Sequence, residues 1–299
     1  MTENTLAKNN FIINFQSFYE LMKPRVMSLV IFTCVVGLII APKEINFINA
    51  IVSLVAVALG AGAAGALNMW YESDVDALMK RTCLRPIPTG KITRKEALIF
   101  GLLTSLISII ALYFFSNFLS ALMLFITITF YVVIYTMWLK QRTSQNIVIG
   151  GAAGAFPPII GWTIASGNIT LEPIILFLII FFWTPSHFWA LSLYKSDDYK
   201  KANIPMLPLT NGIESTKINI FVYSLLMLPV IIFPYLINFV GLTFLIPSLL
   251  LTFYYNFLCY ELYNYKKNKF NPKKAKSIFG YSILYLFLIF VLFLIDKIL

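Results

Sequence analysis

The segment Asn68-Met-Trp-Tyr-Glu72-Ser-Asp74-Val-Asp76-Ala-Leu-Met-Lys80-Arg81-Thr-Cys-Leu-Arg85-Pro86 carries three acidic and then three basic residues directly after a long apolar run. On a continuous helix, side chains at every fourth position lie in one row. That spacing is shared by Asn68, Glu72, Asp76 and Lys80. Acidic side chains at the mouth of a membrane helix are energetically costly, so such a row indicates function.

The composition around this segment is that of a membrane protein. Of the 299 residues, 59% are hydrophobic and 12% are charged, whereas soluble domains carry about 25% charged residues. The length allows one membrane domain, residues 1–299, with a cytoplasmic N-terminal segment at 1–20. The net charge of +10 lies in short loops between apolar runs, which excludes a nucleic-acid-binding surface. The three cysteines are too few and too scattered for a disulfide framework or a zinc site.

Apolar runs long enough to cross a bilayer, which takes about 20 residues in a helix, occur nine times. They are Pro24–Ala41, Ile48–Met69, Ala97–Phe115, Phe118–Leu139, Ile147–Ser166, Pro173–Leu193, Ile218–Ile237, Leu242–Leu262 and Ser277–Ile295. We therefore predict an all-α, polytopic membrane protein whose nine transmembrane helices surround a central cavity open to the cytoplasmic side. Glycines of the second and fifth runs predict close helix packing. They are Gly60, Gly62, Gly65, Gly150, Gly151 and Gly154.

The distribution of basic residues among the loops predicts the orientation of the protein in the membrane. With the N-terminus in the cytoplasm, every one of the 23 basic residues except Lys43 and Lys297 falls on the inner side, as the positive-inside rule requires. We see no cleavable signal and no transit peptide. The sequence therefore favours a bacterial inner (plasma) membrane with a cytoplasmic N-terminus.

The acidic row suits a divalent cation that holds a diphosphate. Mg²⁺ prefers oxygen ligands and usually takes one or two carboxylates together with substrate phosphates. Glu72 and Asp76 are the candidate metal ligands, and Asn68 either ligates or orients them. The basic residues after the acidic row are candidate contacts for the phosphate oxygens. They are Lys80, Arg81 and Arg85. The alternative is a topogenic loop whose charges neutralise one another.

A second candidate site surrounds the only histidine of the chain. His187 lies within an apolar run, and helical spacing places Tyr194 and Asp198 on its face. Ionisable groups inside a membrane span are often functional, although a lone histidine is usually a core residue. Asp197 and Asp198 are a candidate second metal anchor, and an ordinary helix-end pair is the alternative.

Two tyrosines could stabilise a carbocation. Tyr131 and Tyr135 lie one helical turn apart near the inner end of the fourth run, and aromatic faces attract cations at short range. The alternative is an aromatic belt at the membrane interface.

These motifs resemble those of the UbiA-type intramembrane prenyltransferases. The first acidic motif, with Arg81-Thr82-x2-Arg85-Pro86 after it, resembles the one on a cytoplasmic loop of that nine-helix family. Further segments resemble the branch of the family that farnesylates protohaem IX. They are Tyr135-Thr136-x2-Leu139-Lys140, the run from Gly150 to Trp162, His187-Phe188-Trp189-Ala190, Tyr194-x2-Asp197-Asp198-Tyr199 and Ile204-Pro205-Met206-Leu207-Pro208.

The resemblance implies Mg²⁺-assisted transfer of a farnesyl group from farnesyl diphosphate to a vinyl group of haem B, giving haem O. Lys140, His187 and Tyr194 are then candidate substrate-binding residues. Haem B enters as a substrate and not as a retained cofactor, and a downstream haem A synthase is a candidate partner beside the lipid bilayer. The sequence departs from the broad family at Glu72, where aspartate is usual, and at His187 and Tyr194 in the second motif.

Other functions are left open. The nearest is prenyl transfer to an aromatic quinone precursor such as 4-hydroxybenzoate. A cation-coupled transporter is a distant one, because transport predicts ionisable residues near the middle of the bilayer, and here most of them collect at one mouth. A factor that only delivers haem is the third.

Overall fold

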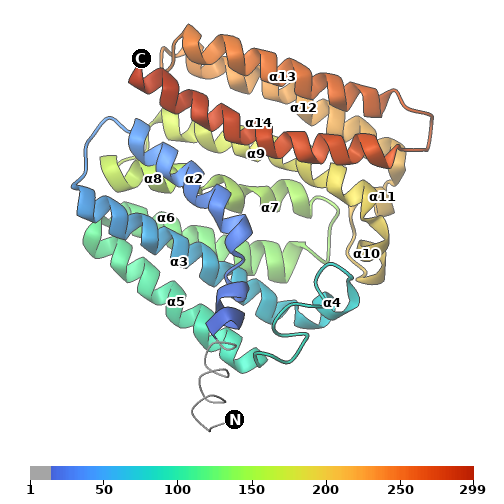
Figure 1. The fold of residues 1–299 in the computed structure, drawn as a ribbon, viewed down its shortest axis with the longest axis horizontal. Helices are drawn as coiled ribbons and strands as arrows, with labels where there is room; N and C mark the ends of the chain where they lie inside the picture. The colour runs from blue at the N-terminus through green and yellow to red at the C-terminus, as the bar shows by residue number, and fades with distance from the viewer. Residues whose placement is uncertain (1–14) are drawn as a thin grey trace, which may run out of the picture.

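The computed structural model describes residues 15–299, without the side chains of Arg25 and Val26. Residues 1–14, most of the predicted N-terminal segment, lie outside the described residues. Residues 15–299 form helices and no strands (Figure 1), and residues 15–21 are helical. The other elements are α2 (Pro24–Ile40), α3 (Phe47–Tyr71), α4 (Ser73–Leu78), α5 (Arg94–Phe115), α6 (Phe118–Thr129), η1 (Phe130–Leu139), α7 (Asn146–Ala155), α8 (Pro157–Ser166), α9 (Leu171–Tyr194), α10 (Ser196–Lys201), α11 (Leu207–Thr210), α12 (Gly212–Leu236), α13 (Leu242–Tyr263) and α14 (Pro272–Ile298).

Eight of the predicted spans are long and apolar enough to cross a membrane. They include Phe118–Leu139, made of α6 and η1, and Asn146–Ser166, made of α7 and α8. The first predicted span, Pro24–Ala41, is α2, which has 17 residues and a shorter apolar part, Met27–Ile40. An all-α, multi-pass membrane protein is thus confirmed, whereas the count of nine spans stays a prediction.

The helices form a ring in which neighbours in sequence mostly pack side by side. α3 packs on α5, α5 on α6, α9 on α12, α12 on α13 and α13 on α14. α2 lies against α8 and also contacts α14, so the first and last helices close the ring. Many large apolar side chains are exposed on the outside of the helix bundle, as expected for a protein whose surroundings are lipid.

Two of the spans differ from a plain α-helix. α7 ends at Ala155 and α8 begins at Pro157, because a proline lacks the N–H that a continuous helix needs. The inner half of the fourth span is the π-helix η1, in which the amide of Lys140 donates to the carbonyl of Tyr135, five residues earlier, at 2.9 Å. A π-helix is rare and often marks a functional site.

Five of the six predicted packing glycines do meet a close neighbour. A Cβ at Gly150 would stand 2.1 Å from the Tyr135 ring, and one at Gly62 would stand 2.6 Å from Met22. Gly154 has nothing within 4 Å. Gly62 and Gly65 of α3 therefore allow close approach of the N-terminal segment, and Gly60 that of α5 and α6. The glycines of α7, Gly150 and Gly151, allow close approach of η1 and α9.

The functional motifs gather at one end of the bundle. Figure 1 shows α4, α10 and α11 together at the end opposite the C-terminus. We call this the basic end, because the loops there carry most of the lysines and arginines. A capping box begins α5, since Thr93 and Glu96 cap each other's backbone amides.

Candidate active site

Asn68, Glu72 and Asp76 keep their helical spacing although the helix is interrupted between α3 and α4. α3 ends at Tyr71, Glu72 is its C-cap, and α4 begins at Ser73. The amide of Asp76 nevertheless donates to the carbonyl of Glu72 at 2.8 Å, which keeps the helical spacing. Asn68, Glu72 and Asp76 are therefore all turned inward, at 2%, 2% and 1% exposure.

Lys80 does not continue that row, so this part of the prediction is wrong. α4 ends at Leu78, and Met79 has an extended backbone with φ −98° and ψ 130°. Lys80 and Arg81 follow in turns and are exposed. Their roles as phosphate contacts stay predictions.

Glu72 is the centre of a polar network. The ammonium group of Lys140 donates to its Oε2 at 2.6 Å, and the Nδ2 of Asn68 donates to the same atom at 2.9 Å. Asn68 Nδ2 also donates to the hydroxyl of Thr136 at 3.1 Å. Thr136 of η1 thus orients the Asn68 amide, and Lys140, the residue after η1, orients the Glu72 carboxylate.

Asp76 is held on one side only. Nη1 of Arg85 donates to its Oδ2 at 2.7 Å, whereas its buried Oδ1 has no hydrogen-bond partner. A buried carboxylate oxygen without a donor is costly and offers a coordination site. Asp74 is exposed and forms an ion pair with Arg94 at 3.0 Å.

Lys23 is a site residue that the sequence analysis did not single out. It immediately precedes α2 in the left-handed conformation, at φ 53°, and its ammonium group donates to Oδ1 of Asn68 at 2.5 Å. Burial, and then the charge of Arg85, lowers the pKa of Lys23 from 10.5 to about 7. The only sequence signal was a Lys-Pro pair at the start of the first apolar run.

The charges suit an anion together with a divalent cation. Lys23, Arg85 and Lys140 are three bases that surround two acids, Glu72 and Asp76. No three His, Cys, Asp or Glu side chains converge anywhere in residues 15–299. Two buried carboxylates and an amide, one carboxylate oxygen being unpartnered, still fit Mg²⁺, which completes its shell with water and substrate phosphate.

The predicted tyrosines lie beside this network. The rings of Tyr131 and Tyr135 are 5.6 Å apart, and the ammonium of Lys140 lies 5.8 Å from the centroid of the Tyr135 ring. The π-helical register places these groups together, since Thr136 Oγ1 donates to the carbonyl of Tyr131 at 2.8 Å. Their role towards a carbocation stays a prediction.

We expect Gly150→Ala to reduce activity by displacing Tyr135. The new Cβ would lie 2.1 Å from the Tyr135 ring, and overpacking of this kind costs about 1–3 kcal/mol. Prenyl transfer by membranes that carry the variant measures the effect. Gly154→Ala, on the same helix with open space, is the control. Equal activity of the two variants would contradict a requirement for the Tyr135 position.

The acidic pair of the second motif lies on the short helix α10. Asp197 is exposed and Asp198 is half-buried, while Tyr199 is buried. Within residues 15–299 the structure does not join Asp197 or Asp198 to Glu72 and Asp76 as one metal-binding cluster. Their metal-binding role stays a prediction.

His187 and Tyr194 of α9 both contact α14. Nδ1 of His187 lies 2.6 Å from the hydroxyl of Ser282, and the ring is stacked between Trp183 and Phe279. Tyr194 contacts Phe279 edge-on. Both are therefore part of the α9–α14 interface, and substrate binding by them stays a prediction.

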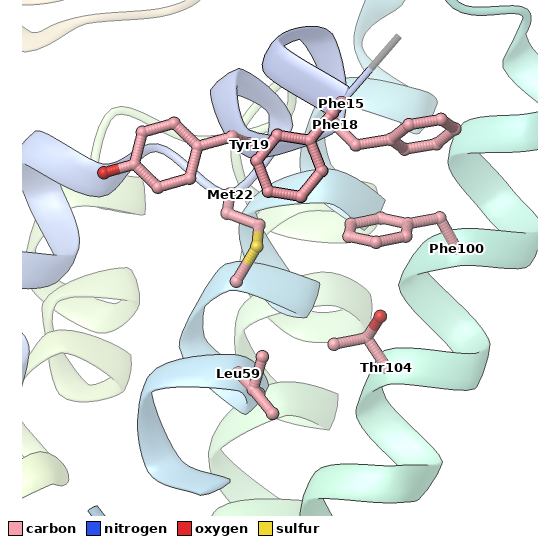
Figure 2. A pocket seen from close by; sticks show the side chains of 7 residues that line it. All are labelled: Phe15, Phe18, Tyr19, Met22, Leu59, Phe100 and Thr104. Atoms are coloured by element: carbon pink, nitrogen blue, oxygen red, sulfur yellow. The ribbon is translucent and has the colours of Figure 1, made fainter. Parts of the chain in front are cut away.

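An apolar recess of about 330 Å³ lies beside the N-terminal segment (Figure 2). Its wall is made by the N-terminal segment, α3 and α5. The lining residues are Phe15, Phe18, Tyr19, Met22, Leu59, Phe100 and Thr104. The rings of Phe15, Phe18 and Tyr19 belong to the N-terminal segment, and Phe18 packs against Phe100 of α5 with ring centroids 5.0 Å apart.

Comparisons with known proteins all point to one protein family. The model of the UbiA prenyltransferase family matches residues 30–294. The protoheme IX farnesyltransferase of Pelagibacter ubique (strain HTCC1062) is 71% identical over 96% of this chain and 95% of its own length. The protoheme IX farnesyltransferase of Parvibaculum lavamentivorans is 50% identical over 95% of this chain and 89% of its own length.

Solved structures with the same fold are more distant in sequence. A digeranylgeranylglyceryl phosphate synthase has a TM-score of 0.79 at 16% identity, covering 95% of this chain and 99% of that one. A UbiA homologue from Archaeoglobus fulgidus bound to GPP and Mg²⁺ has a TM-score of 0.67 at 18% identity, covering 93% and 99%. At such identities the likeness shows the fold.

Proposed function

The chain belongs to the UbiA prenyltransferase family, and from this premise we propose how its buried polar network performs prenyl transfer. It is a transferase that moves a farnesyl group to haem B and gives haem O. The observation that carries this function is the 71% identity, over 96% of the chain, to a protoheme IX farnesyltransferase.

The reaction begins at an allylic C–O bond. That bond of farnesyl diphosphate breaks, and its electron pair leaves with the diphosphate. The farnesyl C1 then bonds to a vinyl carbon of haem B. Water adds to the cation left on the porphyrin side and loses a proton, which completes a hydroxyethylfarnesyl arm.

We propose that the acidic row and its bases hold the diphosphate. Glu72, Asp76 and the Asn68 amide would bind Mg²⁺, which when bound supplies positive charge to the leaving diphosphate. Lys23, Lys140 and Arg85 would donate to the phosphate oxygens where negative charge develops. Glu72 holds Lys140 at 2.6 Å and Asp76 holds Arg85 at 2.7 Å before substrate arrives. Lys23 donates to Asn68 at 2.5 Å.

The surroundings keep the cation from early capture by water. The rings of Tyr131 and Tyr135 lie beside the site and would stabilise positive charge. A dry, apolar chamber prevents hydrolysis of a reactive intermediate. We propose that Asp197 and Asp198 approach the metal only when substrate is present.

We propose the following placement. Residues 1–299 form one domain in a bacterial inner membrane, and the basic end faces the cytoplasm. Farnesyl diphosphate reaches the site from that side, and haem B, which is apolar apart from its carboxylates, enters from the bilayer. A haem A synthase that receives haem O is the proposed downstream partner.

Purified protein in lipid nanodiscs tests the function. We expect radiolabelled farnesyl diphosphate and Mg²⁺ to convert haem B into a product with the mass of haem O. A chelator in excess over Mg²⁺ should abolish the conversion. 4-Hydroxybenzoate in place of haem B should remain unlabelled, and labelling of that acceptor with no haem O formed would overturn the proposal.

A further inference from the structure

An apolar groove of about 530 Å³ runs between α13 and α14, which lie side by side in Figure 1. Its walls include Pro247, Leu251 and Tyr254 of α13 and Tyr281, Leu288 and Ile295 of α14. The hydroxyl of Tyr281 donates to the carbonyl of Leu251 at 2.9 Å, which holds the two walls together. Tyr254 is 51% exposed and Ile295 is 41% exposed, so the groove opens on the outside of the bundle.

The loop that joins the two helices, together with the first turn of α14, carries six lysines and no acidic residue. We call this stretch, residues 266–276, the lysine segment. Its lysines are Lys266, Lys267, Lys269, Lys273, Lys274 and Lys276. All of them are exposed except Lys274, which is half-buried. The segment lies at the basic end of the bundle.

The acids that contact the lysine segment do not cancel its charge. Glu261 of α13 accepts from the ammonium group of Lys274 at 2.9 Å. Glu214 of α12 accepts from the amide of Asn268 at 3.1 Å, but it is already paired with Lys217 at 3.0 Å. The lysine segment therefore keeps a strong excess of positive charge.

Lys217 also fixes the position where the lysine segment begins. Its side chain is fully buried, at 0% exposure, and its ammonium group donates to the carbonyl of Tyr265 at 2.9 Å. The segment is thus held at the end of α13 before any ligand arrives, and this lowers the cost of binding.

The lysines and the groove lie on one face of the helix pair. Residues two helical turns apart share a face. Lys274 precedes Tyr281 by that spacing on α14, and Glu261 follows Tyr254 by the same spacing on α13. The ion pair of Lys274 and Glu261 therefore stands at the end of the groove, next to the exposed Lys273.

The dimensions match one leaflet of a bilayer. From Lys274 to Leu288 the helix α14 rises by about 21 Å. Half of a bilayer with its headgroups is about 20 Å thick. A phosphate group beside Lys273 and Lys274 thus places an acyl chain of the same molecule in the groove, from Tyr281 towards Leu288.

We propose that α13 and α14 bind one anionic phospholipid from the leaflet at the basic end. Its phosphate contacts Lys273 and Lys274, and one acyl chain lies in the groove. Each lysine near an anionic membrane surface strengthens binding about fivefold, whereas a zwitterionic headgroup carries its own cation and gains less. The inference is independent of the proposed function, because none of these residues belongs to the polar network of Glu72.

Native mass spectrometry of the delipidated protein in a neutral detergent counts the bound lipids. We expect phosphatidylglycerol to bind at one tight site, at least about tenfold more tightly than phosphatidylcholine with the same acyl chains. Higher ionic strength should weaken this binding. Glycerol 3-phosphate, which has no acyl chain, should not displace the lipid, and displacement by it would overturn the proposal in favour of a simple anion site.

Paired lysine variants test the headgroup contact. Lys273→Gln combined with Lys274→Gln should weaken phosphatidylglycerol binding about 25-fold, from about fivefold for each lysine, and leave phosphatidylcholine binding unchanged. Lys91→Gln combined with Lys95→Gln removes the same charge from exposed lysines at the start of α5 and should leave both unchanged. Equal effects of the two pairs would show a general charge effect and overturn the site.

A matched pair of tryptophan variants tests the groove. Leu288→Trp fills the groove and should lose the tightly bound phosphatidylglycerol. Leu284→Trp, on the same helix but 51% exposed and outside the groove, should keep it. Light scattering of the same samples gives the oligomeric state. A wild-type dimer that Leu288→Trp converts to a monomer would make the groove an interface between two copies and overturn the lipid site.

Discussion

Asp76→Asn is expected to lower kcat/KM for farnesyl transfer by about 10²–10³-fold, the usual cost of losing one preorganised group that stabilises transition-state charge. The substitution keeps the volume of the side chain and an oxygen that accepts from Arg85, now 2.7 Å from Oδ2. It removes the negative charge and with it the affinity of the unpartnered Oδ1 for a cation. Turnover as a function of Mg²⁺ concentration measures the effect, and saturation should require more metal.

Asp74→Asn is the control for this experiment. Asp74 lies two residues away on the same short helix, but it is exposed and paired with Arg94 at 3.0 Å. Exposed ion pairs contribute about 0–1 kcal/mol, so both activity and metal requirement should stay close to those of the wild type. If Asp76→Asn and Asp74→Asn behaved alike, Asp76 would not hold the metal.

The apolar runs and the helical spacing of the first acidic motif were predictable, because both depend only on residues close together in the sequence. A span of about 20 apolar residues needs no partner to be recognised. Asn68, Glu72 and Asp76 follow helical spacing, and their inward orientation was confirmed. The capping box of Thr93 and Glu96 is another local feature, set by residues three positions apart.

The end of the row was not predictable, because tertiary packing determines it. The sequence around Met79 contains no proline or glycine before Pro86, so nothing local marks the end of α4. In the structure Met79 is buried in the main apolar core and its backbone is extended. The helix has ended before Lys80, which is exposed while Met79 is buried.

Contacts between distant segments and the π-helical register were also beyond the sequence. Lys23 and Asn68 are 45 residues apart, and they meet because the glycines of α3 admit the N-terminal segment. Thr136 reaches Asn68 from η1, where no sequence pattern distinguishes a π-helix from an α-helix. These residues become recognisable only once the helices are assembled.

Lys23→Met is expected to reduce farnesyl transfer about 10- to 100-fold. Charge-assisted hydrogen bonds contribute about 1.5–3 kcal/mol, and each 1.4 kcal/mol is a factor of ten in rate. The loss should appear mainly in KM for farnesyl diphosphate if Lys23 holds the ground-state anion, and in kcat if it acts on the leaving group. Steady-state kinetics with haem B at saturation distinguish the two.

The thermal stability of the same variant separates function from folding. The lowered pKa of Lys23 means that the folded state disfavours its charged form. This lysine therefore opposes folding below about pH 10.5, and the cost grows as the pH falls and is complete below about pH 7. Methionine removes that cost, and the melting temperature at pH 7.5 should stay equal or rise while activity falls. Lys91→Met, at an exposed lysine of the neighbouring loop, should alter neither quantity. A Lys23→Met protein that melts earlier and loses activity in proportion would make Lys23 a structural residue and remove it from the diphosphate site.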